Sequence, residues 1–173
     1  MKNLHEIRLR DHANDEIYTP TSLVKDLMKH IEYEPGQNFF DPFYGTGAFF
    51  NEFPKNDEND YTEINLGKDF FKYTREHDWV VSNPPFSQLT KVIQHTLKLS
   101  VYGFAYLIPV YSLTCHRLKL INEAGFHLNK MVFFKNPKHW GIGFQMAFCI
   151  FTIDKNKSFV NLESSQTIQK RLF

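Results

Sequence analysis

The sequence has little cysteine, little net charge and no long hydrophobic run. Its two cysteines, Cys115 and Cys149, lack metal-binding spacing and stand in apolar contexts, so we expect buried, reduced thiols in an intracellular protein. A formal net charge of +1 excludes a polybasic protein that coats nucleic acid, although it permits local phosphate contacts. Since no apolar run of about 20 residues and no signal peptide is present, we expect neither a membrane span nor export. The eight histidines show no paired zinc pattern, so no metal site is predicted.

The composition that remains is typical of one compact domain. Hydrophobic residues make up 42% of the 173 residues, which argues against disorder. A chain of this length buries roughly 70% of the surface of its unfolded state. We therefore expect a polar arm or lid at residues 1–16, one catalytic domain at residues 17–154 and a tail at residues 155–173.

Helical and strand patterns alternate along the chain. The first helix is expected to begin with Thr19 as its cap and Pro20 in its first turn. Another short helix should follow the first glycine loop, and two more are expected at residues 88–99 and 117–123, the last of them closed by Gly125. Strands are predicted at residues 38–41, 60–64, 69–72, 78–82, 103–110, 127–134 and 144–153. This order favours an α/β fold with a doubly wound, mostly parallel sheet and an antiparallel late strand.

A glycine loop follows the first predicted strand. The strand ends in Asp41, and the chain then turns through Gly45-Thr46-Gly47 into an apolar segment. Strand, tight turn and helix in this order are typical of a Rossmann-like nucleotide site, where glycines let the backbone approach the ligand. Phe50 occupies the third glycine position of the dinucleotide fingerprint, and no Gly-Lys-Ser/Thr follows. Both a nicotinamide oxidoreductase and a phosphate loop are therefore disfavoured.

The tetrapeptide Asn83-Pro84-Pro85-Phe86 follows an apolar run that ends at Val81. An exocyclic aromatic amine is a poor nucleophile because its lone pair is conjugated with the ring. Two acceptors aimed at its protons favour the pyramidal form that attacks an electrophile. The Asn83 side-chain oxygen and the Pro84 carbonyl are the candidate acceptors, held stiffly by two prolines, and Phe86 can stack on a flat target base. The alternative is a sharp loop exit without chemistry.

Together, Asp41-Pro42-Phe43-Tyr44-Gly45-Thr46-Gly47 and Asn83-Pro84-Pro85-Phe86 resemble the signature motifs of the amino-methyltransferases. This family includes the DNA adenine-N6 methyltransferases. The resemblance covers about residues 15–153. It implies a Rossmann-like class I methyltransferase fold, S-adenosylmethionine as cofactor, and methyl transfer to the N6 amine of adenine in DNA. An adenine inside a duplex would have to be flipped out of the stack to be reached.

The resemblance also implies a set of cofactor contacts. Tyr18 and Thr19 belong to an opening segment that closes over the methionine end. Glu63 falls where the family places an acid on the ribose hydroxyls, and Asp69 precedes the aromatic residue beside the cofactor adenine. Glu63 as a solvated strand-end acid and Asp69 as a turn acid are the alternatives. The full predicted set is Tyr18, Thr19, Asp41, Pro42, Phe43, Gly45, Gly47, Glu63, Asp69 and Phe70.

Two later loops are candidates for contacts with the substrate. Tyr111 follows the strand predicted next to the catalytic one, at the carboxyl end where ligands of open α/β sheets bind. In the loop between the last two strands, Lys138 and His139 could meet phosphates and Trp140 could stack on a base. An exposed hairpin loop with one packed tryptophan is the alternative.

The sequence departs from the family because it has no room for a large target-recognition domain. Asp69 and Asn83 stand close together, and only 19 residues follow Asp154. We therefore expect a catalytic core with loose sequence preference, or one that borrows recognition from a partner subunit or a second copy. Methylation of RNA (adenine N6 or guanine N2), methylation of a protein glutamine amide, and a noncatalytic subunit of a larger complex remain alternatives.

Overall fold

The computed structural model describes residues 18–154, so the predicted arm and tail lie outside the described residues. A six-stranded sheet forms the centre of this part of the chain, in the order β2-β1-β3-β4-β6-β5. The strands are β1 (Phe39–Asp41), β2 (Asp60–Tyr61), β3 (His77–Ser82), β4 (Ser100–Pro109), β5 (His127–Phe133) and β6 (Met146–Thr152). The helices are α2 (Thr21–Met28), α3 (Leu89–Thr96) and α4 (Cys115–Glu123).

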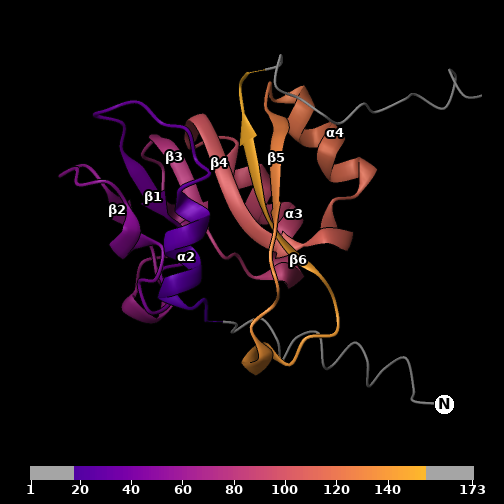
Figure 1. Ribbon diagram of the computed structural model, residues 1–173. Coiled ribbons are helices and arrows are strands. Elements are labelled where there is room, and N and C mark those ends of the chain that lie inside the picture. Colours follow the sequence, from indigo (N-terminus) through magenta and orange to yellow (C-terminus); the bar gives the residue numbers. More distant parts are fainter. Residues whose placement is uncertain (1–17, 155–173) are drawn as a thin grey trace, which may run out of the picture.

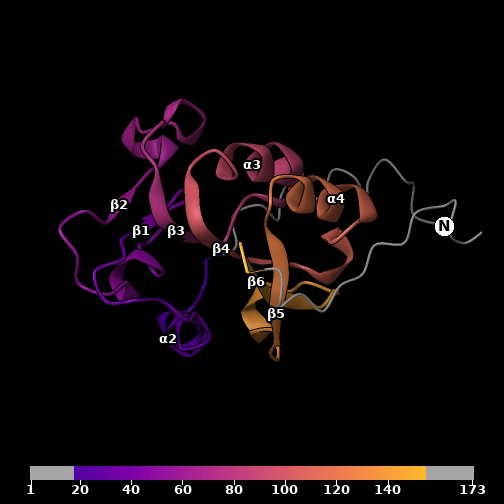
Figure 2. The same cartoon turned by 90° about the horizontal axis from the view of Figure 1, so that it is seen from above.

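The sheet has the mixed topology that the sequence predicts. β1 pairs in parallel with β2 and β3, and β3 pairs in parallel with β4. β6 is antiparallel to both β4 and β5. Helix α2 covers one face and helices α3 and α4 cover the other, which gives three layers (Figures 1 and 2). The doubly wound fold with an antiparallel late strand is thereby confirmed.

Strand β4 shows how the sequence builds two cores at once. Its residues from Gly103 to Pro109 are all buried, and alternate side chains point to opposite faces. Phe104 and Tyr106 pack in the apolar cluster with α3 and α4, whereas Ala105 and Leu107 pack in the cluster with α2. A continuous apolar run is what a central strand needs when both faces of the sheet are covered.

Several local predictions were wrong. Residues 70–72 form a 3₁₀ turn (Phe70–Lys72) instead of a strand, because the Asp69 carboxylate accepts a hydrogen bond from the Phe71 N–H at 3.0 Å and begins a turn. After the glycine loop the chain forms only the 3₁₀ turn Phe50–Glu52. Helix α2 begins at Thr21 with Pro20 in extended conformation at the N-cap position, so Thr19 is not its cap.

Two remaining expectations concern cysteine and membranes. Cys149 is buried in β6, but Cys115 is exposed as the first residue of α4. The prediction of a buried thiol is therefore wrong for Cys115. Within residues 18–154, no helix combines the length and the apolar character that crossing a bilayer requires.

Candidate cofactor and substrate site

A cavity of about 890 Å³ opens beside the carboxyl ends of β1 and β3. This edge of the sheet is where open α/β folds bind ligands, and the volume lies within the usual range for small-molecule sites. Many residues predicted from widely separated motifs meet here. The predicted residues that line the cavity are Tyr18, Thr19, Pro42, Phe43, Gly45, Glu63, Asp69, Phe70, Asn83 and Pro85.

The glycine loop is held open by the segment that follows β2. The Gly45 N–H donates to Glu63 Oε2 at 2.9 Å, and the Tyr44 N–H donates to the Thr62 carbonyl at 3.1 Å. The other carboxylate oxygen of Glu63 accepts from the Asn65 N–H at 3.1 Å. Glu63 is therefore a positioned acid that lines the cavity, and each of its oxygens keeps a further lone pair for a ligand hydroxyl.

Gly47 supports the loop from behind and does not line the cavity. Its φ is +79°, and a Cβ there would lie 2.6 Å from the Tyr44 hydroxyl oxygen. Only glycine accepts this conformation without strain. The residue is needed for the shape of the loop, and the structure gives it no surface on the cavity side.

Asp41, which the sequence predicts to contact the cofactor, does not line the cavity. Its side chain is buried, and Oδ1 accepts from the Ser82 hydroxyl at 2.6 Å and from the Phe43 N–H at 3.2 Å. Oδ2 has no hydrogen-bond partner among residues 18–154. Burial raises the pKa of this carboxyl to about 7, although the bond from Ser82 lowers it in part. Asp41 ties the end of β1 to the end of β3, directly before Asn83.

The tetrapeptide Asn83-Pro84-Pro85-Phe86, which the sequence predicts to be catalytic, begins immediately after β3. Asn83 Nδ2 donates to the Thr19 hydroxyl at 3.3 Å, and both residues line the cavity. The amide oxygen is then the acceptor on the other arm of the Asn83 side chain. Pro84 is buried and Pro85 lines the cavity, whereas Phe86 is half-buried against the cluster of α2.

Three exposed apolar residues of the cavity were missed by the sequence analysis. Ile64, Leu66 and Phe71 line it and are 67%, 61% and 41% exposed. Large apolar side chains on the surface beside a cleft are a signature of ligand contact. Each stands within three positions of Glu63 or Asp69, so apolar residues next to these two acids were the available signal.

The four residues predicted to bind the substrate lie apart from the cavity lining. Trp140 is only 8% exposed, and its indole N–H donates to the Tyr18 carbonyl at 3.1 Å. Its ring is packed inside the protein, which agrees with the alternative of a loop with one packed tryptophan. Lys138 and His139 are exposed beside it in the 3₁₀ turn Lys138–Trp140, and Tyr111 is exposed after β4.

Solved structures similar to this chain share its fold at low sequence identity. A protein from Pyrococcus horikoshii assigned as an RNA methyltransferase aligns with a TM-score of 0.58 and 17% identity, over 81% of this chain and 88% of its own. The M protein of the type I restriction enzyme EcoKI aligns with 0.57 and 15%, over 80% of this chain and 44% of its own. Magnesium protoporphyrin IX methyltransferase from Synechocystis, solved with bound S-adenosylmethionine, aligns with 0.51 and 12%, over 88% and 85%.

These likenesses establish the fold, which is the Rossmann-like class I methyltransferase fold. The sequence itself matches no family model and no curated protein. The chain spans less than half the length of the EcoKI M protein. The names of the three structures refer to RNA, to a restriction enzyme and to a porphyrin. The fold alone therefore does not define a substrate.

Proposed function

We propose that this protein is an S-adenosylmethionine-dependent methyltransferase that methylates the exocyclic N6 amine of adenine in DNA. The observation that carries the proposal is that Asn83 and Pro85 line the same cavity as the glycine-loop residue Gly45 and the acid Glu63. An acceptor for an amine and a cradle for a nucleotide-like cofactor thereby share one space.

The residues of the cavity fit S-adenosylmethionine by their chemistry. Glu63 offers carboxylate lone pairs for two adjacent ribose hydroxyls. The exposed apolar side chains of Ile64, Leu66 and Phe71 provide surfaces for an adenine ring, and Asp69 stands beside them as an acceptor for its amine. Tyr18 lies over the glycine loop, with its ring 3.5 Å from where a Cβ of Gly45 would be. Bound S-adenosylmethionine supplies an electrophilic methyl group.

The contribution of the protein to catalysis is the placement of acceptors around the target amine. The Thr19 hydroxyl accepts from Asn83 Nδ2, so the Asn83 oxygen is the arm that can accept from the amine. The Pro84 carbonyl is the proposed second acceptor, and Phe86 the proposed stacking surface. Preplaced dipoles at a developing charge typically contribute 10²–10³ in rate for each group. No strong base is required, because the methylated nitrogen becomes acidic and loses its proton afterwards.

The core is proposed to obtain sequence recognition from another chain or a second copy. Within residues 18–154, Asp69 and Asn83 are joined by the 3₁₀ turn Phe70–Lys72 and by β3 (His77–Ser82), with no inserted domain. The M protein of EcoKI, which belongs to a restriction enzyme, is a structural relative of this core. We therefore expect a complex of this core with another chain, or with a second copy of itself, to recognise the target sequence.

The test is methyl transfer from labelled S-adenosylmethionine to duplex DNA, single-stranded DNA, RNA and total protein. We expect N6-methyladenine in DNA, and a loss of at least about 100-fold in Asn83→Ala while the affinity for S-adenosylmethionine stays within about twofold of the wild type. Asn51→Ala is the matched control, since Asn51 is exposed and does not line the cavity. Label only in RNA or protein would replace the proposed substrate. Failure to bind S-adenosylmethionine would overturn the proposal that the protein is a methyltransferase.

A further inference from the structure

Charge is divided unevenly between the two halves of the described chain. Residues 79–154 contain two acidic residues, Glu123 and Asp154, and seven basic ones: Lys91, Lys98, Arg117, Lys119, Lys130, Lys135 and Lys138. Residues 18–78 contain twelve Asp and Glu and six Lys and Arg. The net charge of +1 for the whole chain conceals this division. A strong difference in charge between two halves of a chain is typical of proteins that bind a polyanion with one half.

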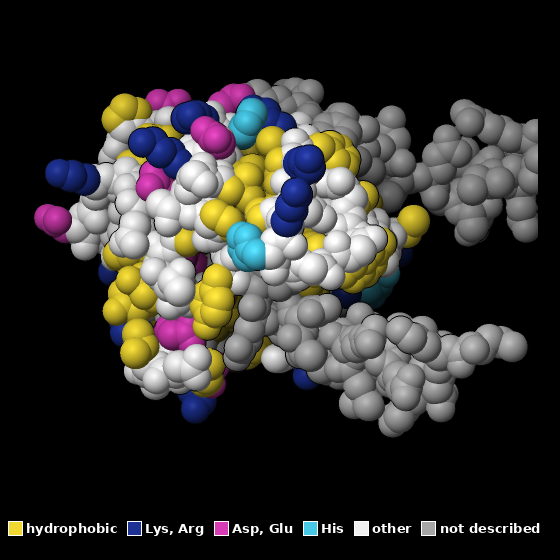
Figure 3. All heavy atoms as spheres, turned by 60° about the horizontal axis from the view of Figure 1, so that its bottom comes forward, with side chains coloured by type: hydrophobic (Ala, Val, Ile, Leu, Met, Phe, Trp, Pro, Cys, Tyr) yellow, Lys and Arg dark blue, Asp and Glu magenta, His cyan; other side chains and the backbone are white. Residues whose placement is uncertain are grey.

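Part of the cationic half lies at the same edge of the sheet as the cavity. The loop at residues 134–145 joins β5 to β6 and contains no Asp or Glu. Its Lys135, Lys138 and His139 side chains are exposed. Figure 3, which looks toward this edge, shows Lys, Arg and His side chains beside exposed hydrophobic ones near the centre, whereas acidic and basic side chains are mixed on the left. A phosphate on this loop would meet no carboxylate within it.

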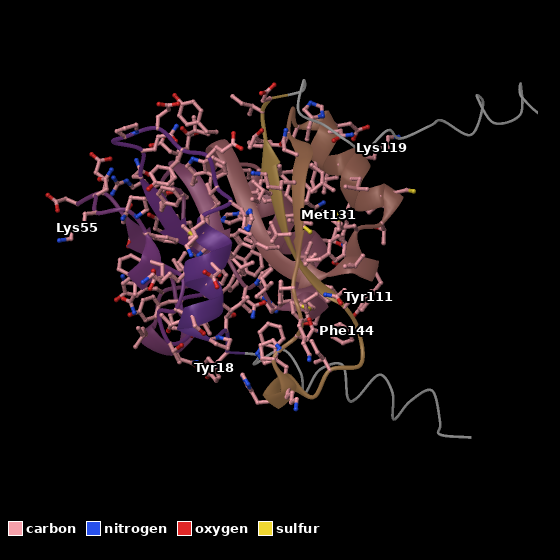
Figure 4. The ribbon with its side chains drawn as sticks, in the orientation of Figure 1. Tyr18, Lys55, Tyr111, Lys119, Met131 and Phe144 are labelled. Carbon is pink, nitrogen blue, oxygen red and sulfur yellow. The ribbon has the colours of Figure 1, made fainter. Side chains whose placement is uncertain are left out.

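One residue of this loop, Phe144, forms an aromatic pair with Tyr111. Tyr111 is 64% exposed, and its ring meets the edge of Phe144 with the ring centroids 5.3 Å apart and the planes at 84°. Figure 4 shows both side chains beside one another at the end of the sheet where Tyr18 also lies. A tyrosine ring with this exposure offers surface on which a base can stack.

The turn that carries Tyr111 is fixed from below. Arg117 donates from its Nη1 to the Ser112 carbonyl at 2.7 Å and from its Nε to the Thr90 hydroxyl at 2.9 Å. The buried Ser112 hydroxyl donates to the Pro109 carbonyl at 2.6 Å. A rigid aromatic residue loses little conformational entropy when a ligand binds to it.

The loop is also connected to the cavity. Trp140, between the exposed His139 and the rest of the loop, donates to the Tyr18 carbonyl at 3.1 Å, and Tyr18 lines the cavity. A nucleic-acid strand lying over the loop would therefore pass close to Tyr18. The next residue, Thr19, accepts a hydrogen bond from Asn83, which is proposed to bind the target amine.

We propose that Tyr111, Phe144, Lys135, Lys138 and His139 form the surface that holds an unpaired nucleic-acid strand next to the target base. We call these five residues the Tyr111 surface. The proposal rests on the proposed function, of which it specifies the substrate contact. Stacking of a neighbouring base on Tyr111 together with phosphate contacts from two lysines is the combination by which proteins hold single strands with little sequence preference. Binding of an acidic protein partner would involve the lysines but would give the exposed aromatic pair no role.

The experiment measures binding of the full chain to fluorescein-labelled oligonucleotides of about 16 nucleotides. The probes are single-stranded DNA, single-stranded RNA and the DNA duplex of the same sequence, at salt concentrations from about 50 to 200 mM. We expect Tyr111→Ala to weaken single-strand binding roughly 5- to 100-fold, and Tyr111→Trp to retain it because the indole also stacks. Comparison of the DNA and RNA probes shows which of the two sources of an unpaired strand is held.

Charge variants test the phosphate part of the surface. The double variant Lys135→Gln/Lys138→Gln should lower the slope of log affinity against log salt by about 1.4, since each phosphate contact with a single strand contributes about 0.7. Lys55→Gln is the matched control, because Lys55 is exposed but belongs to the acidic half. Wild-type binding by Tyr111→Ala, or an equal loss in Lys55→Gln, would overturn the proposal. The proposal would also be overturned if the wild-type chain self-associates and Tyr111→Ala dissociates it without changing its affinity for the strand.

The binding assay separates this proposal from the proposed function. It needs neither cofactor nor turnover, and it is repeated on Asn83→Ala. Strand binding that depends on Tyr111, in a wild-type chain that does not bind S-adenosylmethionine, would overturn the methyltransferase function and support the surface. If the wild type methylates adenine and Tyr111→Ala changes neither the affinity for the strand nor the KM, the methyltransferase function is supported and the proposed surface is overturned.

Discussion

The two sides of the sheet are stabilised in different ways. On the side of the cavity, β1 and β2 span only three and two residues, and the chain around them runs through 3₁₀ turns at Ile64–Leu66 and Phe70–Lys72. On the other side, β4 and β6 span ten and seven residues and pair over seven consecutive positions. Long regular strands satisfy their own backbone groups, whereas short irregular segments need other partners.

Those partners on the cavity side are individual polar side chains. Glu63 and Asp69 each accept from backbone N–H groups, and the Thr62 hydroxyl donates to the Pro42 carbonyl at 2.7 Å. Loops fixed in this way can adopt the shape that a ligand requires, because no repeating pattern constrains them. The long paired strands β4 and β6 therefore form the scaffold, and the cavity side carries the residues proposed to bind ligands and to act in catalysis. Three variants test this distinction.

Gly103→Ala should have the largest effect, and it concerns the scaffold. A Cβ at Gly103 would lie 2.5 Å from a ring carbon of Trp79 and 2.7 Å from the Phe151 carbonyl oxygen. We expect a loss of about 1–3 kcal/mol in the free energy of unfolding, measured by urea denaturation, with unchanged cofactor affinity of the folded fraction. Gly143→Ala is the control, because nothing lies within 4 Å of its added Cβ. Equal stability of the two variants would contradict a tightly packed scaffold.

Thr19→Val should change turnover more than stability, and it concerns the chemistry. The substitution keeps the shape of the side chain but removes the oxygen that accepts from Asn83 Nδ2 at 3.3 Å. A net loss of about 1 kcal/mol for one hydrogen bond corresponds to about a fivefold lower kcat. Thr19→Ser should restore kcat because it keeps the hydroxyl. A decrease in cofactor affinity as large as the decrease in kcat would show that Thr19 acts on the cofactor instead of on Asn83.

Asp41→Asn, at the border between the two sides, should have the smallest effect at low pH and an effect on stability that grows as the pH rises. Burial raises the pKa of Asp41 from 3.8 to about 7. The folded state therefore binds a proton that the unfolded state has released, and the stabilisation is present below pH 3.8 and lost as the pH rises through about 7. Because Asn does not titrate, the variant should gain stability relative to the wild type over that interval.

The Asp41 prediction is measured by urea denaturation at several pH values. His77, whose pKa burial lowers to about 4, has the opposite slope in both proteins and cancels in the difference. Asp57→Asn is the control for removal of a carboxylate, since Asp57 is exposed. A difference between Asp41→Asn and the wild type that stays constant with pH would contradict the raised pKa of Asp41.

The sequence predicted the fold well because its signals are periodic and local. The apolar run of β4 and the glycine at position 125, which has a φ of +89° after α4, are properties that neighbouring residues alone specify. The failure at residues 69–72 has a physical reason. Phe70 and Phe71 have the composition of a strand, but the Asp69 carboxylate accepts the Phe71 N–H and starts a turn, so that N–H is not available to a ladder.

The sequence by itself determined which residues could perform the chemistry and at which edge of the sheet they would meet. The types and spacing of Gly45, Glu63 and Asn83 place them after strands, and parallel strands end at a common edge. Only the tertiary structure decided which of the candidates face the cavity. Asp41 is buried by the bond from Ser82, 41 positions away, and Trp140 is held inside by the Tyr18 carbonyl, 122 positions away. Burial depends on which distant segments pack together, and no local pattern in one sequence contains that information.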